Sequence, residues 1–287
     1  MEMTQLQELL TFMECREEQE FQKDEPSSCG TILENIYYHL DRHPQHTLDI
    51  LYPVKAKRIY PVIFYIHGGG FCMHSKDRMY RNYATRLAQD EFALVNINYR
   101  LAPTASYAQI LLDVQDALCF VAQHAPEYHL DPTCIFLCGD SAGGYLAMQG
   151  VDYLLKESIG LTCRGVGSLC GILDLQECKN NPEIKFPLKK EILHMLFLDD
   201  VIPNDTAIYR LLSKEFPAVY LMDTAWRSFD HQAKVLNQYL KQYAIPHKLH
   251  ILPKEEKLKH NFQIVGNHPK SKLVMQEMFT YFHSFLK

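Results

Sequence analysis

The sequence lacks the features that would point to a membrane, a thiolate metal site or a nucleic acid. No run approaches the ~18 consecutive apolar residues that span a bilayer, and the acidic amino terminus lacks the basic start and apolar stretch of a secretion signal. The nine cysteines form no Cys-x-x-Cys pair, which argues against a thiolate zinc site. Lys and Arg never gather into a patch, so no nucleic-acid partner is expected.

What is present is the composition of an ordinary globular protein. The chain has 287 residues, of which 47% are hydrophobic and 22% charged, and a formal net charge of −5. We expect one domain over residues 1–287. The odd number of cysteines favours buried thiols in a reducing cytoplasm over a disulfide framework. The oligomeric state stays open, with a dimer as one option.

Short apolar runs rich in β-formers recur along the chain, with amphipathic stretches between them. The runs cover residues 62–66, 93–97, 134–138, 165–172, 218–222 and 247–252. Runs that are apolar on both faces indicate strands buried on both faces, and the stretches between them are long enough for crossover helices. The pattern predicts an α/β fold with a mostly parallel sheet and helices on both faces.

Three segments fall outside this alternation. Residues 31–40 and 47–53 flank a proline-containing turn and are expected to form an antiparallel pair at the sheet edge. The amino-terminal 1–30 and the stretch at about 175–215 match neither strand nor crossover helix. We expect both to lie over one end of the sheet.

The first motif with chemical meaning is "GDSAGG", residues 139–144, directly after an apparent strand and before a helical run. Gly-x-Ser-x-Gly in this context is typical of a nucleophile elbow, a tight turn that presents a serine hydroxyl. Ser141 is therefore the candidate nucleophile, and the amide of Ala142 is a candidate donor to an oxyanion.

A second glycine motif, "HGGGF" at residues 67–71, follows the apolar run at 62–66. Glycines let the backbone approach a ligand and leave its amides uncovered. An oxyanion needs a donor from another loop besides the elbow. We expect the amides of Gly69 and Gly70 to supply it, with His67 bracing the loop.

Together with "NYRLAP" at 98–103, these motifs resemble the hormone-sensitive-lipase-like esterases of the α/β-hydrolase superfamily, from about Leu48 to the end of the chain. In that family "HGGGF", "YRLAP" and "GDSAG" occur in this order. The resemblance implies an α/β-hydrolase fold with a small helical cap. It assigns the cap to residues 1–30 and about 175–215, and it implies no metal and no organic cofactor.

The general base is expected late in the chain, because the histidine follows the serine and the acid in this type of site. His260, in "LKHNF", comes after the last apolar run and resembles the family's "GHxF" site, with Lys259 where glycine is usual. Competing late histidines are His247, His250, His268 and His283. The first two lie in an expected strand, the third in a turn and the fourth in the terminal helix, so His260 is preferred.

The carboxylate that would orient this histidine should follow the run at 218–222, where the chain reads "MDTAWRSFDHQA". The family's usual "DFL" or "DPL" brings Arg227 or Ser228 to the acid position. Three carboxylates nearby stay open: Asp230 as the first choice, with Asp223 and Asp174 as alternatives. Asp230 also has a structural explanation, because acids favour helix N-termini.

The residues and the resemblance lead to one functional expectation and two alternatives. We expect a serine carboxylesterase that hydrolyses small, short-acyl esters through an acyl-enzyme. A hydrolase that lacks its acid would turn over slowly, so a ligand-binding protein on the same fold is one alternative. A peptidase using the same residues is the other.

Overall fold

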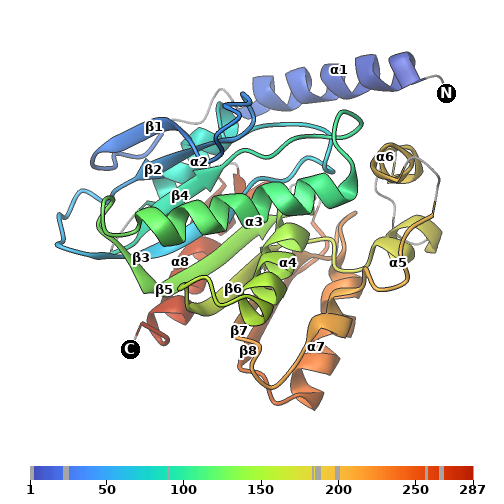
Figure 1. The fold of residues 1–287 in the computed structure, drawn as a ribbon. Helices are drawn as coiled ribbons and strands as arrows, with labels where there is room; N and C mark the ends of the chain where they lie inside the picture. The colour runs from blue at the N-terminus through green and yellow to red at the C-terminus, as the bar shows by residue number, and fades with distance from the viewer. Residues whose placement is uncertain are drawn as a thin grey trace.

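An eight-stranded sheet forms the centre of the structure, a computed structural model (Figure 1). It describes residues 3–21, 26–88, 91–182, 184, 189–197, 201–255, 258–264 and 268–286. The strands are β1 (Ile32–Tyr37), β2 (Thr47–Leu51), β3 (Tyr60–Ile66), β4 (Ala93–Ile97), β5 (Leu130–Asp140), β6 (Cys163–Leu169), β7 (Ala218–Thr224) and β8 (His247–Leu252). Their order in the sheet is β1-β2-β4-β3-β5-β6-β7-β8.

The six strands expected from the apolar runs are all present, and they pair in parallel. Every residue of β4 and β7 is buried, as the two-sided apolar runs predicted. The antiparallel pair of β1 and β2 is also confirmed. However, β2 continues into the sheet by pairing antiparallel with β4, so only β1 is an edge strand on this side.

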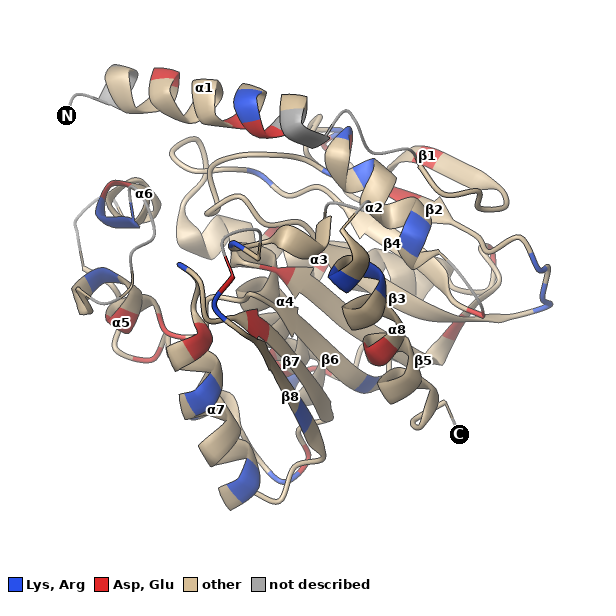
Figure 2. Ribbon diagram, turned by 180° about the vertical axis from the view of Figure 1, so that it is seen from behind, with Lys and Arg blue, Asp and Glu red and all other residues tan. Residues whose placement is uncertain are grey.

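Helices cover both faces of the sheet. They are α1 (Met3–Phe21), α2 (Met79–Leu87), α3 (Tyr107–His124), α4 (Ala142–Lys156), α5 (Leu175–Asn180), α6 (Lys189–Leu196), α7 (Asp230–Gln242) and α8 (Pro269–His283), with 3₁₀ turns η1 (Ile208–Leu211) and η2 (Phe262–Ile264). One apolar core packs α3, α4 and α7 against the sheet, and a second packs α2 and α8 against the opposite face. Figure 1 shows α3 and α4 in front, and Figure 2, from behind, shows α2 and α8.

The segments that did not fit the alternation lie beside the loop that follows β3. In α1, which runs along the top of Figure 1, Glu14 accepts a hydrogen bond from the His74 amide at 3.0 Å, and Glu17 contacts the His74 ring at 3.1 Å. On α6, Ile192 lies so that its Cδ1 would be 3.3 Å from a Cβ added to Gly70. Parts of both segments (1, 2, 22–25, 183, 185–188 and 198–200) lie outside the described residues.

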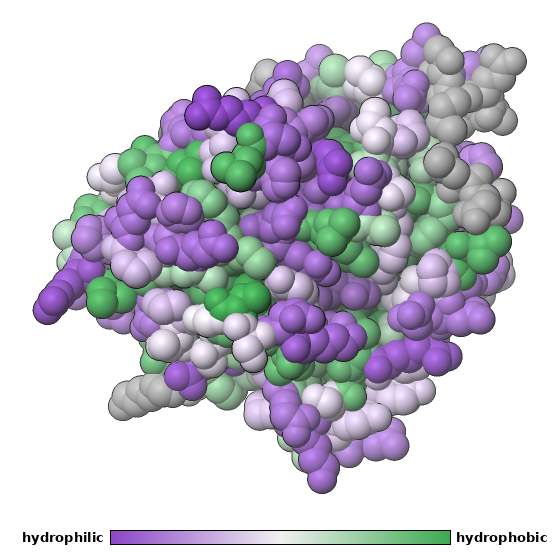
Figure 3. All heavy atoms as spheres, in the orientation of Figure 1, coloured by the Kyte–Doolittle hydropathy of each residue, from purple (hydrophilic) through white to green (hydrophobic). Residues whose placement is uncertain are grey.

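Three further observations concern the surface, the length of the helices and the thiols. Hydrophilic and hydrophobic atoms are interspersed over the face that carries α3 (Figure 3). In the part of the chain that the structure describes, no helix is both long enough and apolar enough to cross a bilayer. The nine cysteines are free.

Candidate active site

Ser141 lies at the sharp turn between β5 and α4, with φ 51° and ψ −119°. This positive φ is uncommon for a residue with a side chain. The two flanking glycines explain why the turn can form: a Cβ on Gly139 would lie 2.3 Å from the Gly143 oxygen, and one on Gly143 only 2.0 Å from the Ile66 oxygen. The sequence motif therefore folds as a nucleophile elbow, with α4 packed directly against the end of β3.

His260 lies on the loop after β8, and its Nε2 is 3.0 Å from the Ser141 Oγ. This is hydrogen-bond distance between a nucleophile and its base. The Phe229 ring meets the imidazole edge-on, with centroids 5.3 Å apart. Desolvation lowers the pKa of His260 below its usual value. His260 as a whole residue is half-buried.

Among the described residues, the side chain at the other ring nitrogen is Ser228, whose Oγ lies 2.9 Å from His260 Nδ1. The expectation for Asp230 is therefore corrected. Asp230 is the first residue of α7, and its carboxylate pairs with Lys234 at 2.5 Å. Asp174 is also occupied elsewhere, because it caps α5 by accepting a hydrogen bond from the Glu177 amide at 2.9 Å.

Asp223, the remaining alternative, lies near the end of β7 and is 1% exposed. Its Oδ1 accepts a hydrogen bond from the Thr224 amide at 2.7 Å. Burial raises the pKa of Asp223 to about 7, against hydrogen bonds with Ser228, the Thr224 amide and Cys170 that lower it. Ser228 thus contacts His260 and is among the groups that affect the pKa of Asp223.

The competing late histidines have structural contacts instead. His247 and His283 each place Nδ1 2.7 Å from a backbone oxygen, of Ile245 and Phe279 respectively. His268 accepts a hydrogen bond from the Lys270 amide at the start of α8. His250 pairs with Glu277. Among the late histidines that the structure describes, His260 is the one whose ring contacts Ser141.

Gly69 and Gly70, the residues expected to donate to an oxyanion, lie on the loop after β3. Gly69 and Gly70 have φ +104° and +60°, and their amides donate no hydrogen bond to the described residues. A Cβ on Gly69 would lie 2.1 Å from the Met73 oxygen, so only glycine fits there. Ala142 is the first residue of α4, where an amide has no partner within the helix.

The "YRLAP" segment braces this loop from the next strand. The Tyr99 hydroxyl donates to the His67 oxygen at 3.0 Å, and the two rings stack with centroids 4.4 Å apart. The Ala102 amide donates to the Phe71 oxygen at 2.8 Å. Burial lowers the pKa of His67 to about 3, so its imidazole is neutral and acts as a packed support, as expected from the sequence.

A metal site has one candidate among the described residues, and it lies apart from Ser141. His39, Asp41 and His46 offer ligand atoms within 4.8 Å of one another. They lie on the connection between β1 and β2, at the sheet edge. The His46 Nε2 faces the buried carboxylate of Asp113 at 3.2 Å, so an imidazole bridging two carboxylates accounts for the cluster.

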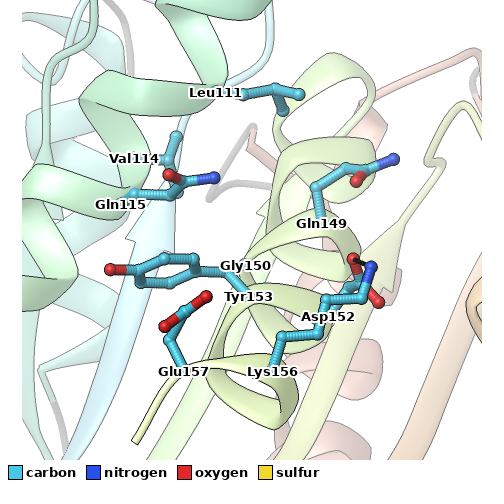
Figure 4. Close-up of a pocket in the computed structure, with 9 residues that line it drawn as sticks. All are labelled: Leu111, Val114, Gln115, Gln149, Gly150, Asp152, Tyr153, Lys156 and Glu157. Carbon is cyan, nitrogen blue, oxygen red and sulfur yellow. Dashed lines mark hydrogen bonds and ion pairs between the residues drawn. The ribbon is translucent and has the colours of Figure 1, made fainter. Parts of the chain in front are cut away.

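A cavity of about 350 Å³ opens between α3 and α4 (Figure 4). Its lining on α4 begins at Gln149 and ends at Lys156, more than two helical turns beyond Ser141. The side chains there are mostly polar, and Lys156 pairs with Asp152 at 2.6 Å. This cavity is therefore separate from the serine and histidine.

A family model described as BD-FAE matches residues 48–193. The chain belongs to the BD-FAE family. The matched range contains the glycine motif at residues 67–71 and the nucleophile elbow at 139–144, and it ends before β7.

The BD-FAE chain is also similar to individual proteins of known name or structure. The chain is 32% identical over 200 residues to arylacetamide deacetylase of Oryctolagus cuniculus, covering 65% of this chain and 43% of that protein. Esterase B from Lactobacillus rhamnosis has a TM-score of 0.84 at 22% identity, over 99% of this chain and 95% of that chain. The metagenomic carboxylesterase EstE1 has a TM-score of 0.77 at 18% identity, over 98% and 97%. These structures establish the α/β-hydrolase fold expected from the sequence.

Sequence reasoning gave no role to one central residue of this BD-FAE chain, Asp140. Its Oδ1 accepts from the Tyr65 hydroxyl at 2.6 Å and the Gly68 amide at 3.1 Å, and its Oδ2 from the Tyr80 hydroxyl at 2.8 Å and the Asn261 amide at 2.7 Å. Asp140 thus joins the elbow, the glycine loop and the histidine loop. The sequence offered one signal for this role, because Asp140 lies inside the "GDSAGG" motif and directly precedes Ser141.

Proposed function

We propose that the protein is a serine carboxylesterase that works through an acyl-enzyme. The observation that carries this proposal is the 3.0 Å contact between Ser141 Oγ and His260 Nε2, on an elbow that adjoins the glycine loop. A nucleophile, a base in contact with it and uncovered amides are the parts that acyl transfer requires.

In the first half-reaction, Ser141 Oγ attacks the ester carbonyl while its proton passes to His260 Nε2. The amides of Gly69, Gly70 and Ala142 stabilise the oxyanion, each donor contributing about 3 kcal/mol to transition-state stabilisation. The tetrahedral intermediate collapses, and His260 returns the proton to the departing alkoxide. Water then attacks the acyl-enzyme with the same base, which releases the acid and restores the Ser141 hydroxyl.

The substrates that we propose are small esters with short acyl groups. Ile192 of α6 lies over Gly70, which limits the space beside the oxyanion loop. A C4-C4 tributyrin phosphonate inhibits esterase B, so a neighbour of the same fold accepts four-carbon chains. The name of the rabbit relative, arylacetamide deacetylase, is also consistent with removal of a short acyl group.

We further propose that the chain is one α/β-hydrolase domain whose cap is formed by residues 1–30 and about 175–215. The contacts of Glu14 and Glu17 with His74, and of Ile192 with Gly70, support this arrangement, because both segments touch the loop that carries the oxyanion donors.

Turnover of p-nitrophenyl acetate, butyrate and decanoate tests the proposal directly. We expect kcat/KM to be highest for acetate or butyrate and to fall for decanoate. Ser141→Ala should abolish hydrolysis of all three. Equal or faster decanoate hydrolysis would contradict the short-acyl preference, and hydrolysis that survives in the variant would contradict the serine mechanism.

One observation favours a second function, ligand binding by a slow hydrolase. A hydroxyl, not a carboxylate, contacts His260 Nδ1, and such a change can lower kcat by about 10⁴-fold. A fluorophosphonate probe separates the two functions, because stoichiometric labelling of Ser141 requires an activated nucleophile. Labelling supports the esterase, and absence of labelling in folded protein supports the binding protein.

A further inference from the structure

The contact between Ser228 and His260 raises the question of what holds the imidazole in its working tautomer. Nε2 must be unprotonated to receive the Ser141 proton, so the ring proton lies on Nδ1. That N–H points at the Ser228 Oγ, 2.9 Å away. Ser228 therefore accepts this hydrogen bond, and its own hydroxyl proton must be directed to a different acceptor.

The surroundings of Ser228 offer two acceptors, Asp223 and the sulfur of Cys170. Burial raises the pKa of both groups, and a contribution from the Ser228 hydroxyl opposes the rise in each, which is consistent with both lying near that hydroxyl. A thiol is a weak acceptor and a carboxylate a strong one. The Asp223 Oδ2 is buried and accepts no hydrogen bond of standard geometry from the described residues. A buried carboxylate oxygen that lacks a donor is the acceptor that the Ser228 hydroxyl proton would favour.

We propose that Asp223 orients His260 through the Ser228 hydroxyl, so that the chain Asp223–Ser228–His260–Ser141 replaces the usual direct contact between acid and histidine. This inference rests on the proposed esterase function. Ser228 and Asp223 are positioning residues in it, because neither touches the substrate.

The burial of Asp223 explains why its carboxylate can affect His260 through Ser228 without touching the imidazole. An anion held in a poorly solvated place interacts more strongly with neighbouring dipoles and charges than one in water. Asp223 is 1% exposed, and its other oxygen is fixed by the Thr224 amide. When His260 becomes an imidazolium, the intervening hydroxyl transmits the stabilisation by donating to the carboxylate and accepting from Nδ1–H.

No proton moves between His260, Ser228 and Asp223 during the reaction. The Ser141 proton moves to His260 Nε2 and from there to the leaving alkoxide. The Nδ1 proton stays on His260, and the Ser228 proton stays on Ser228. The bonds that form and break are those of ordinary acyl transfer, and Asp223 contributes only charge.

Four variants, assayed for kcat on p-nitrophenyl butyrate at pH 8.5, test the chain. Ser228→Ala and Asp223→Asn should each lower kcat by roughly 10- to 100-fold with little change in KM. The double variant should be no slower than the worse single variant, because both changes break one chain. Ser228→Thr, which keeps a hydroxyl, should retain most of the activity.

Moving the acid gives the sharpest test. Ser228→Asp combined with Asp223→Asn puts a carboxylate directly at Nδ1 and should recover the activity that Asp223→Asn loses. The control is Ser158→Ala, which removes an exposed hydroxyl elsewhere and should leave kcat within twofold. If Asp223→Asn leaves kcat unchanged while Ser228→Ala lowers it, Ser228 acts alone and the chain is wrong.

A readout that needs no turnover separates this inference from the proposed function. The chain predicts that Asp223→Asn and Ser228→Ala both lower the pKa of His260, followed by NMR of its ring protons. This result would stand even if the wild-type protein proved not to hydrolyse esters. An unchanged pKa of His260 in Asp223→Asn would overturn the chain whatever the activity.

Discussion

The two halves of the candidate site are built differently. The half that we propose stabilises charge, formed by the glycine loop and the elbow, is fixed by steric necessity and by the four hydrogen bonds to Asp140. The half that moves the proton places a hydroxyl where a carboxylate is usual, with the carboxylate behind it. The comparison teaches that a loop whose backbone amides must face an oxyanion tolerates few residue types. A histidine side chain, in contrast, can be oriented by more than one kind of group.

The largest expected effect removes the residue that both halves share. Ser141→Ala should lower kcat on p-nitrophenyl butyrate by about 10³-fold or more, because no nucleophile remains to form the acyl-enzyme. Fluorophosphonate labelling should disappear in parallel. Residual labelling at another residue would show that the two halves are not centred on Ser141.

The second-largest effect is expected for Gly69→Ala, which changes the glycine loop of the charge-stabilising half. The added Cβ meets the Met73 oxygen at 2.1 Å, so the loop must shift and a donor is lost, which should lower kcat by about 10²-fold. Gly160→Ala is the matched control, because Gly160 also has a positive φ of +86° but its Cβ would meet nothing within 4 Å. If both variants behave alike, backbone strain and not the oxyanion loop explains the loss.

The link between the halves is tested by Asp140→Asn. The amide group would turn a donor toward groups that are themselves donors, so the glycine loop and the histidine loop should both loosen. We expect kcat to fall roughly tenfold, with a lower thermal midpoint, since breaking a buried network costs about 1–3 kcal/mol. Asp152→Asn, in an exposed pair with Lys156, should change neither quantity. Unchanged kcat in Asp140→Asn would mean that the halves are held independently.

The proton-moving half should also respond to pH. Burial raises the pKa of Asp223 to about 7, with Asp230 adding to the rise and Ser228, the Thr224 amide and Cys170 opposing it. Asp223 is neutral below that pH and anionic above it, so kcat should rise several-fold from pH 6 to pH 8. Asp223→Asn should flatten this rise. A rise that persists in Asp223→Asn would assign it to another group.

The smallest effect concerns α1, which touches the charge-stabilising half only from outside. Burial opposes protonation of His74, yet hydrogen bonds with Glu14 and Glu17 raise its pKa to about 9. Because this pKa exceeds the usual 6.5, the stabilisation is complete below pH 6.5 and is lost as the pH rises through about 9.

The double variant Glu14→Gln/Glu17→Gln should therefore lower the thermal midpoint at pH 6 by about 2–4 °C. The difference from wild type should shrink above pH 9. Exposed Glu8→Gln on the same helix is the control and should have no effect. A loss of stability that is the same at pH 6 and pH 10 would show that the His74 charge is not involved.

The sequence by itself determined the sheet, the elbow and the glycine loop. Strands such as β4 and β7 are apolar on both faces, and the glycines at positions 69, 139 and 143 stand where any Cβ would collide with backbone. Such requirements are local, so residue type and order reveal them. His260 could be preferred for a related reason, because chain order places the base after the serine.

Only the tertiary structure decided which group orients His260. Asp174, Asp223, Ser228 and Asp230 lie within reach of the same strand ends, and their order in the chain does not say which one faces Nδ1. That depends on how the loop after β7 turns before α7, which pairs Asp230 with Lys234 and brings Ser228 to the imidazole. The role of Asp140 was hidden for the same reason, because all four of its hydrogen-bond partners lie 60 or more residues away along the chain.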